Sequence, residues 1–399
     1  MNILFLTLSK IESIDDGGIY TDMVRELASR GINMYVVSPR EKRMNLPTEL
    51  TIKENISILK VRTGNITQTN FLEKGISTFA IENQYLYALR KYFKGIKFNM
   101  IIYSTPPITF ESLVKYLKNK HNSITYLILK DIFPQNAVDL NIIRKGRFIW
   151  KYFRNKEIKL YKMSDMIGCM SKGNVDYVLQ HNPYLDKRKV EIFPNSIKPV
   201  EREKKIKSER IFGEYDLPNE LILFVYGGNL GRPQGIDFLL LVIENFHKVD
   251  NAHLFIVGSG TEYEKIRIHI DTLNLKNVSL FNKLPKIEYN QLIEMADVGL
   301  IFLDGRFTIP NFPSRLTSYM EYSIPILAST DKITDLKEVL TESESGFWSE
   351  SGDLNSFIDN AKKLSLDKSL RDRMGENGRK YLENNYDISK NVEIIIKHL

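Results

Sequence analysis

The residues best suited to chemistry lie in the stretch Val225–Gly235, which reads VYGGNLGRPQG. The apolar run Ile222–Val225 is predicted to be a strand that leads into Gly227 and Gly228. Without side chains, these glycines let backbone N–H groups approach an anion. Arg232 supplies a positive charge a few residues later. The pattern indicates either a phosphate site or a tight strand-to-helix turn with a solvated arginine.

Other glycine-rich turns follow predicted strands in the same way. Gly17 and Gly18 come before an amphipathic helix near the start of the chain and can present N–H groups to a phosphate. Gly258 and Gly260, in VGSG, are a second place for close backbone approach, although a lone tetrapeptide is a weak signal. Asn229, beside the first glycine turn, can add a hydrogen-bond donor.

A third polar loop, Asp304–Arg315, reads DGRFTIPNFPSR and precedes a helix expected at Leu316–Tyr322. Ser314 can cap that helix, and Arg315 stands beside its N-terminus. The plain alternative is a capped surface helix. Because Arg232 and Arg315 both follow predicted strands, together they favour a clamp for a diphosphate.

The elements that must position these loops follow one plan throughout the chain. Short apolar, β-branched runs alternate with longer amphipathic stretches, which is the pattern of parallel strands with crossover helices. The predicted strands are Ile3–Leu8, Met34–Ser38, Met100–Ser104, Thr125–Leu129, Met166–Met170, Val190–Phe193, Leu221–Tyr226, His253–Val257, Val278–Phe281, Gly299–Leu303 and Pro325–Ala328. A polar segment, Ile197–Arg210, reads as a linker. We predict an α/β fold of two tandem, Rossmann-like, doubly wound parallel sheets that face a cleft.

Charge is uneven between the halves of the chain. Residues 1–200 hold 31 Lys and Arg against 18 Asp and Glu, whereas residues 201–399 hold 25 against 31. The basic half could face nucleic acid, anionic lipid or a phosphorylated small molecule. Without zinc-finger spacing or a basic repeat, we expect no nucleic-acid partner. The six histidines have no ligand spacing, so we expect no metal site.

Two observations bear on location. No apolar stretch approaches the roughly 20 residues of a membrane span, and no basic leader precedes the first strand, so we expect a cytoplasmic protein. The segment Ile142–Met163 contains eight Lys and Arg and one acidic residue, interleaved with aromatic and aliphatic residues. This composition is typical of a helix lying on anionic lipid, and a core-facing helix with a basic solvent side is the alternative.

Eight blocks in order along the chain carry a family resemblance: GGIYTDMVRELASRG, LKDIFPQNAVDL, KMSDMIGCMSKGNVDYV, VEIFPNSI, YGGNLGRPQGIDFLL, LFIVGSGTEYEKI, ADVGLIFL and FPSRLTSYMEYSIPILAS. They resemble the retaining nucleotide-sugar glycosyltransferases of family 4, nearest the branch that builds capsule and O-antigen polysaccharides. The resemblance implies the GT-B fold. It places an acceptor-binding domain at residues 1–198, a nucleotide-sugar-binding domain at 199–375, and a helical segment, 376–399, that packs back on the first domain.

The resemblance also implies roles for the site residues. Gly17 and Gly18 look like the loop that meets the donor diphosphate from the N-terminal domain, and Asn282 and Lys283 resemble the segment that reads the nucleotide base. Asp131 resembles part of the branch's DLWP-type block and is our candidate for contacting the acceptor hydroxyl or the donor sugar. A helix cap or a turn aspartate is its alternative.

The chain departs from the family at two places. Relatives carry an arginine and a lysine for the diphosphate where Asn229 and Gln234 stand here, so Arg232 and Arg315 are inferred to replace those charges. The acidic motif of two glutamates separated by seven residues falls on Pro310 and Ser318. Ser318 thus stands where a glutamate would hold the donor ribose, and Glu321, one turn further on, is the nearest acidic substitute.

The resemblance implies a retaining, metal-independent hexosyl- or N-acetylhexosaminyltransferase without a cofactor. Its substrate would be a nucleoside-diphosphate sugar, with UDP as the expected nucleotide, and its acceptor a glycan, linked to polyprenyl diphosphate. The expected location is peripheral, on the inner face of the cell membrane. Two arginines could stabilise the departing diphosphate without a metal.

Other functions stay open. A catalytically silent subunit that binds nucleotide sugar or lipid is favoured by the missing acidic motif, and the two arginines argue against it. A nucleotide-sugar epimerase of the same fold would carry acidic and histidine residues for proton transfer, but no histidine ends a predicted strand. An NAD-dependent dehydrogenase lacks its glycine fingerprint.

Overall fold

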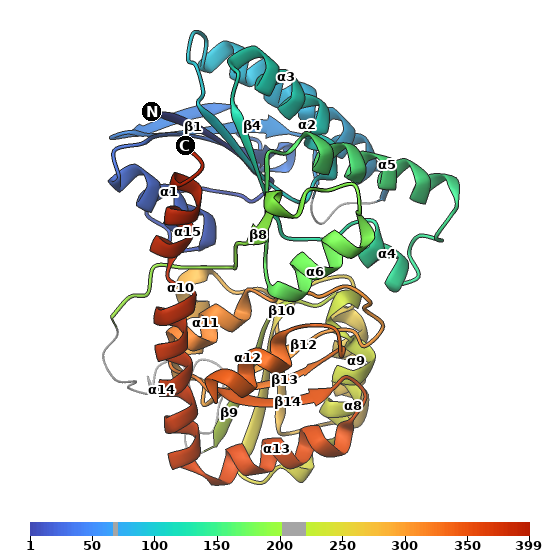
Figure 1. Ribbon diagram of the computed structural model, residues 1–399. Helices are drawn as coiled ribbons and strands as arrows, with labels where there is room; N and C mark the ends of the chain where they lie inside the picture. The colour runs from blue at the N-terminus through green and yellow to red at the C-terminus, as the bar shows by residue number, and fades with distance from the viewer. Residues whose placement is uncertain (67–70, 202–220) are drawn as a thin grey trace. The chain divides into compact units, whose positions relative to one another are not determined.

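The computed structural model describes residues 1–66, 71–201 and 221–399, which divide into two compact units (Figure 1). The N-terminal unit comprises Met1–Lys198, Ile309–Asn311 and Asp387–Leu399, and the C-terminal unit comprises Pro199–Thr308 and Phe312–Tyr386. Most of the predicted linker, from residue 202 onward, lies outside the described residues.

The described part of the N-terminal unit forms an eight-stranded sheet in the order β3-β4-β2-β1-β5-β6-β7-β8. The strands are β1 (Asn2–Leu6), β2 (Asn33–Glu41), β3 (Glu49–Lys53), β4 (Ile56–Thr63), β5 (Met100–Ser104), β6 (Ile124–Leu129), β7 (Met166–Cys169) and β8 (Val190–Ile192). Only the pair β3 and β4 is antiparallel. The central strands β1 and β5 are continuous apolar runs because helices cover both of their faces.

Helices connect the parallel strands of this unit. They are α1 (Ile19–Ser29), α2 (Phe71–Tyr92), α3 (Glu111–His121), α4 (Gln135–Asp139), α5 (Phe148–Met163) and α6 (Lys172–His181). The C-terminal α15 (Ile388–Ile396) also belongs to this unit but connects no strands. Two strands, β3 and β4, were missing from the prediction. Charged Lys60 and Arg62 interrupt the apolar run of β4, and β3 is an exposed edge strand, so neither presents a strong apolar signal.

The C-terminal unit contains a six-stranded, fully parallel sheet in the order β11-β10-β9-β12-β13-β14. Its strands are β9 (Ile222–Asn229), β10 (Ala252–Ser259), β11 (Val278–Phe281), β12 (Val298–Phe302), β13 (Ile326–Thr330) and β14 (Gly346–Glu350). Its helices are α8 (Ile236–Asn245), α9 (Tyr263–Leu273), α10 (Lys286–Met295), α11 (Arg315–Glu321), α12 (Leu336–Ser343), α13 (Leu354–Leu366) and α14 (Lys368–Asn385). The prediction missed β14, whose five residues include only two large apolar ones.

The predicted fold class, two α/β units built on doubly wound parallel sheets, is confirmed. The sequence pattern located the central strands well because strands buried on both faces must be apolar along their whole length. The core of the C-terminal unit shows the result, since Phe224, Leu254, Leu300 and Leu327 from four neighbouring strands are fully buried in one cluster.

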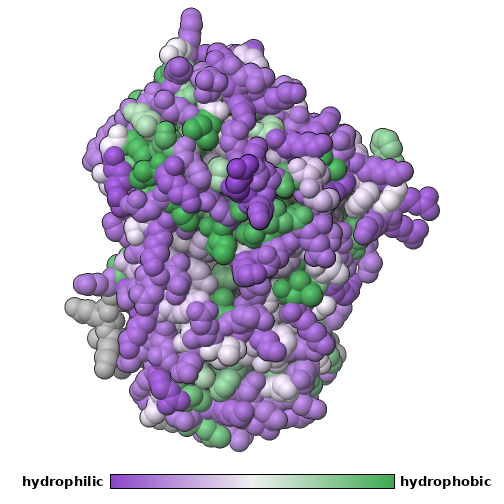
Figure 2. Space-filling view, viewed as in Figure 1, coloured by the Kyte–Doolittle hydropathy of each residue, from purple (hydrophilic) through white to green (hydrophobic). Residues whose placement is uncertain are grey.

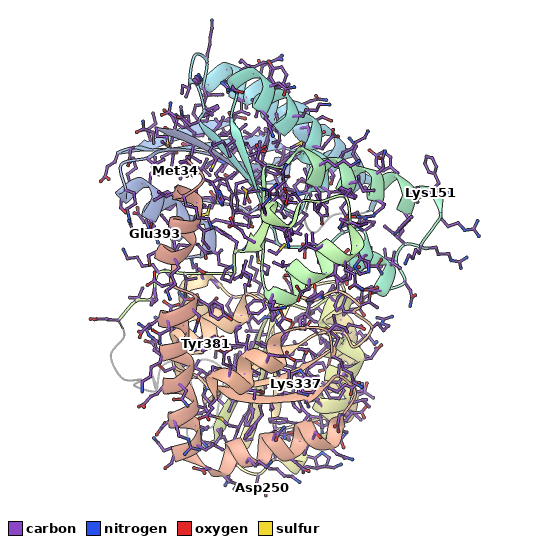
Figure 3. All side chains as sticks on the ribbon, in the orientation of Figure 1. Met34, Lys151, Asp250, Lys337, Tyr381 and Glu393 are labelled. Atoms are coloured by element: carbon purple, nitrogen blue, oxygen red, sulfur yellow. The ribbon has the colours of Figure 1, made fainter. Side chains whose placement is uncertain are left out.

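Helix α15 completes the N-terminal unit although it is the last element of the chain. Asp387 caps it by accepting a hydrogen bond from the backbone N–H of Ser389 at 2.8 Å. The buried Asn391 side chain donates to the carbonyl oxygen of Pro194 at 2.8 Å. Glu393, labelled in Figure 3, pairs at 2.9 Å with Arg30, the residue that follows α1.

We expect Asn391→Leu to destabilise the N-terminal unit by about 1–3 kcal/mol, because it leaves a buried carbonyl oxygen without its hydrogen-bond donor. Chemical denaturation followed by circular dichroism measures the change. Lys390→Ala, at an exposed position of the same helix, is the control and should change stability by less than about 0.5 kcal/mol. Equal effects of the two substitutions would contradict the assignment.

Candidate functional site

Each sheet has a switch point. There the chain stops adding strands on one side of the first strand and continues on its other side. In the C-terminal unit the chain moves from β9 outward to β11 and then resumes at β12, on the other side of β9. In the N-terminal unit it moves outward from β1 and resumes at β5, on the other side of β1. Open parallel sheets bind ligands beside such points, at the carboxyl ends of the strands. The residues that end these strands are therefore the candidate sites.

The carboxyl end of β9 has no side chains at Gly227 and Gly228. The predicted glycine turn is in fact strand, since these residues pair in register with β10 and the strand continues to Asn229. Gly228 has a φ of 137°, and a Cβ there would lie 2.7 Å from a terminal nitrogen of Arg315. A Cβ on Gly227 would collide with the Tyr289 ring. The glycines thus make room for two side chains of this unit.

Arg315, the first residue of α11, is half-buried against this strand end. Its guanidinium carbon lies 4.5 Å from the centre of the Tyr226 ring, which attracts the cation. Burial raises the pKa of Tyr226, against the lowering effect of the Arg315 charge, so its hydroxyl stays protonated. Tyr319, from the next turn of α11, donates to the carbonyl oxygens of Val225 and Leu300 at 3.1 Å each. These contacts hold α11 against β9 and β12.

Arg232 differs from Arg315 in its surroundings. It begins a short 3-10 turn, Arg232–Gln234, and its side chain is 61% exposed. Its guanidinium lies 3.8 Å from a carboxylate oxygen of Glu262, too long for a strong pair at an exposed site. The sequence correctly placed both arginines beyond the ends of strands. That they converge on one diphosphate stays a prediction.

The loop that carries Arg232 is held together by hydrogen bonds among its own residues. The Asn229 side chain donates to the Gln234 side-chain oxygen at 2.7 Å, and the N–H of Gly231 donates to the same oxygen at 3.3 Å. The Tyr226 hydroxyl donates to the Asn229 carbonyl oxygen at 2.8 Å. Asn229 was predicted to bind the donor, and in this structure its side-chain amide helps to shape the loop.

Gly258 and Gly260 were predicted to allow the backbone to approach a ligand, but the structure gives them another neighbour. A Cβ on Gly258 would collide with the carbonyl oxygen of Gly228, and one on Gly260 with the carbonyl oxygen of Leu230. The close approach is therefore between β10 and the end of β9. These glycines support the candidate site by packing, and their contact with a donor stays a prediction.

Asn282 and Lys283 follow β11 and are both exposed. The Asn282 side chain accepts a hydrogen bond from the backbone N–H of Lys283 at 2.7 Å, which forms a local turn. Their expected contact with a nucleotide base stays a prediction.

The helix after the polar loop begins at Arg315 and ends at Glu321. Ser314 occupies the cap position, but its side chain makes no capping hydrogen bond, because its backbone has helical angles that point the side chain away. The predicted side-chain cap is wrong. Ser318 is half-buried on this helix, and the Glu321 carbonyl oxygen accepts a hydrogen bond from Arg379 at 3.0 Å. Pro310, in the loop, offers its carbonyl oxygen to Asn174 at 2.6 Å.

In the N-terminal unit, Gly17 and Gly18 precede α1. The N–H of Gly18 donates to a carboxylate oxygen of Asp22 at 3.1 Å, so this amide is already satisfied within the unit. The other oxygen of the buried Asp22 accepts from the N–H of Lys198 at 2.9 Å. This arrangement contradicts a free Gly18 amide. Gly17 is exposed, and open space lies where its Cβ would stand.

Asp131 lies directly beyond β6, at the predicted place. The Thr105 hydroxyl oxygen accepts hydrogen bonds from the backbone N–H groups of Lys130 and Asp131 at 3.0 and 3.3 Å, which joins this turn to the end of β5. Burial raises the pKa of the Asp131 carboxyl, and the charge of Lys130 opposes that rise.

Lys130 is a site residue that sequence reasoning missed. Its ammonium nitrogen donates to the Asn195 side-chain oxygen and lies 5.6 Å from the centre of the Tyr20 ring. Burial lowers the pKa of the Lys130 amine to about 7, and the Asp131 carboxylate opposes this shift. Its position at a strand end, next to Asp131, was the available signal, but one sequence does not reveal that Tyr20 and Asn195 enclose it.

Part of the basic segment Ile142–Met163 is buried in the core of the N-terminal unit. Helix α5 begins only at Phe148, and toward its other end Leu160 and Tyr161 are buried with Glu157. Phe148 and Ile149 are 83% and 56% exposed, respectively, and Lys151 lies at the right-hand edge of Figure 3. Figure 2 shows hydrophobic atoms among hydrophilic ones in that region. The exposed large apolar side chains of the predicted segment therefore lie near its beginning, and the later part of the helix packs into the core.

Among the described residues, no three His, Cys, Asp or Glu side chains gather in a way that could hold a metal ion. Within residues 1–66, 71–201 and 221–399, every helix is too short or too polar to cross a membrane.

Comparison with solved structures identifies the class of fold. Over 100% of this chain, the fold matches 98% of sucrose-phosphate synthase from Thermosynechococcus elongatus with a TM-score of 0.76 and 16% identity. It also matches 99% of Anabaena Alr3699/HepE, solved in complex with UDP and glucose, with a TM-score of 0.69 and 12% identity. The fold is therefore that of GT-B proteins.

Sequence comparisons add a family assignment for part of the chain. Residues 207–381 match the family described as Glycosyl transferases group 1, so the C-terminal unit carries a domain of that group. The chain is 25% identical over 269 residues to the probable glycosyltransferase WbjE of Pseudomonas aeruginosa, covering 65% of this chain and 64% of that protein. It is 35% identical over 182 residues to the capsular polysaccharide biosynthesis glycosyltransferase CapM of Staphylococcus aureus, covering 43% and 44%. Each alignment spans less than two thirds of the relative's length.

The packing of Gly258 against the Gly228 carbonyl oxygen predicts how a substitution changes stability. Gly258→Ala forces a methyl group into the Gly228 carbonyl oxygen and should destabilise the C-terminal unit by about 1–3 kcal/mol without any ligand. Thermal unfolding measures this loss. Thr261→Ala, at an exposed position just beyond β10, is the control. Unchanged stability of the Gly258 variant would mean that the two strand ends are not in contact.

Proposed function

We propose that this protein is a retaining glycosyltransferase that transfers a sugar from a nucleoside-diphosphate sugar, with UDP as the nucleotide, to a glycan acceptor in bacterial surface polysaccharide biosynthesis. The observation that carries the proposal is the Arg315 guanidinium held on Tyr226 and Gly228 beside the switch point of the C-terminal sheet. The match to the group 1 family and the similarity to the probable glycosyltransferase WbjE support sugar transfer, and the similarity to CapM, a glycosyltransferase of capsular polysaccharide biosynthesis, supports the pathway.

A guanidinium in this position suits a leaving diphosphate. When the bond between the sugar and the diphosphate breaks, negative charge grows on phosphate oxygens, and a positive group fixed beforehand stabilises that charge without reorganising. The Tyr226 ring and the strand backbone hold Arg315 in place, whereas the exposed Arg232 must move to its ligand. We propose that Arg315 is the fixed member of the clamp and Arg232 the mobile one, and that transfer needs no metal.

The N-terminal unit supplies the acceptor side in this proposal. Asp131 lies just beyond β6, the strand next to β5 in the sheet, and its carboxyl can accept a hydrogen bond from an acceptor hydroxyl. In a single-step transfer, retention requires that this hydroxyl attack from the face that the diphosphate leaves. We propose Asp131 as the group that orients it.

A lipid-linked acceptor would bring the protein to a membrane surface. Ile142, Phe148 and Ile149 are exposed hydrophobic residues, and exposed basic residues accompany them. These basic residues are Arg144, Lys145, Arg147 and Lys151. Apolar side chains beside cations favour the interface of an anionic bilayer. We propose that residues 142–151 contact the inner face of the cell membrane and that the acceptor is linked to polyprenyl diphosphate.

The function is tested with a panel of UDP-glucose, UDP-galactose, UDP-N-acetylglucosamine and GDP-mannose. At least one should raise the melting temperature of the wild-type chain, because ligand binding stabilises the folded state. Arg232→Ala should lower turnover of that donor at least tenfold, a loss of about 1.4 kcal/mol of transition-state stabilisation, with an unchanged melting temperature. Arg267→Ala, an exposed arginine on α9, is the control. No stabilisation by any donor, or normal turnover by the Arg232 variant, would overturn the proposal.

Membrane contact is tested by sedimentation with vesicles containing phosphatidylglycerol. The wild-type chain should bind at low salt and less at high salt, because cations of residues 142–151 meet anionic lipid. Phe148→Ser with Ile149→Ser should reduce binding several-fold. Ile268→Ser is the matched control, since Ile268 is 56% exposed, as is Ile149. Binding that is absent in the wild type, or equal in all three proteins, would exclude this surface.

A further inference from the structure

The carboxyl ends of β1, β5 and β6 enclose a small polar cluster around one amine. The Ser104 hydroxyl donates to the Thr7 hydroxyl oxygen at 3.2 Å. The Thr105 hydroxyl oxygen accepts a hydrogen bond from the backbone N–H of Lys130, which lies in the turn after β6. Lys130 extends from that turn to the Asn195 side-chain oxygen and the face of Tyr20. The cluster lies beside the switch point of the sheet, where a ligand is expected.

Lys130 differs in its hydrogen-bond partner from two other partly buried lysines of this unit, Lys118 and Lys156. Lys118 lies 2.7 Å from a carboxylate oxygen of Asp165, and Lys156 lies 3.1 Å from one of Glu111. Each of these two ammonium groups thus has a carboxylate partner. The hydrogen-bond partner of Lys130 is instead the neutral amide of Asn195. A neutral partner and partial burial leave the amine free to lose its proton.

We propose that Lys130 is a further catalytic residue, the base that takes the proton of the acceptor hydroxyl during sugar transfer. This inference rests on the proposed function and deepens it by naming the proton acceptor. Asp131 keeps its role of orienting the hydroxyl group.

The step balances without a co-reactant. The acceptor O–H bond breaks and its oxygen forms a bond to the anomeric carbon, while the bond from that carbon to the diphosphate oxygen breaks. The bonding electrons leave with the nucleoside diphosphate. The proton moves to the neutral nitrogen of Lys130, which becomes an ammonium ion and later returns the proton to solvent.

The surroundings of Lys130 suit a base that works near neutral pH. Two titratable groups of the described chain face it: Asp131 from its own turn and Tyr20 from α1. Burial lowers the pKa of the amine to about 7 against the charge of Asp131, and burial raises the pKa of Tyr20, which stays neutral. A base is most effective when its pKa lies near the working pH. Activity should therefore rise as the pH increases through about 7, because the neutral amine is the active form.

The first test measures how the reactivity of the Lys130 amine depends on pH, without any substrate. Competitive labelling with acetic anhydride between pH 5 and 10, followed by mass spectrometry, should show half-maximal reactivity of Lys130 near pH 7. The peptide carrying Lys120, an exposed residue of α3, is the internal reference. Reactivity of Lys130 that follows the reference across the whole range would overturn the inference.

The second test uses turnover of the donor that most stabilises the wild-type chain, with water as the acceptor and nucleotide release as the signal. Lys130→Arg keeps the positive charge but cannot act as a base, so turnover should fall at least 100-fold while the thermal shift caused by the donor persists. Lys120→Arg is the matched control. Asn195→Asp places a carboxylate at the amine and should move the rise in activity to higher pH.

The outcomes separate the two proposals. An active wild type with normal turnover by the Lys130→Arg variant overturns this inference alone, and so does an Asn195→Asp profile that does not move. If Asn195→Asp fails to fold, as circular dichroism would show, the labelling and the Lys130→Arg result decide. A wild type that turns over none of the donors overturns the proposed function and, with it, the role of Lys130.

Discussion

The contact between Arg315 and the end of β9 is the constraint on which the C-terminal site depends. A guanidinium can lie on the Tyr226 ring only because Gly228 has no side chain, and Tyr289 can cover the strand only because Gly227 has none. The same packing holds α11 near β9 and β12 through Tyr319. A charged group is thereby fixed at the switch point of the sheet, where reorganisation costs least in a reaction that develops charge.

Both sheets have a switch point, and we propose that the two units use it for different chemistry. The C-terminal unit presents a permanently charged guanidinium, which suits an anionic group that does not change protonation. The N-terminal unit presents Lys130 and Asp131, whose burial shifts both pKa values toward the neutral forms. An amine that can gain or lose a proton near neutral pH, as Lys130 can, is suited to a hydroxyl group. In our proposal, the donor and the acceptor therefore meet surfaces of different character.

Several glycines predicted to face a ligand instead face the protein itself. The N–H of Gly18 binds Asp22, and Gly258 and Gly260 pack on carbonyl oxygens at the end of β9. The physical reason is general: a backbone amide can bind an internal carboxylate as well as a phosphate, and a missing Cβ accommodates a neighbouring strand as well as a ligand. A glycine pattern therefore indicates where another group comes close to the backbone, and only the fold shows which group it is.

The sequence by itself determined the class of fold and the strand ends that matter. Strands buried on both faces must be apolar throughout, so β1, β5, β6, β9, β10 and β12 were visible as runs, and the polar loops beyond them followed. Edge strands β3 and β14 lacked that signal. The tertiary structure alone decided that Arg315 rests on Tyr226, that Gly18 is already satisfied, and that Tyr20 and Asn195 enclose Lys130. These relations join residues distant in the chain, and their energies depend on burial and distance, which only the folded chain defines.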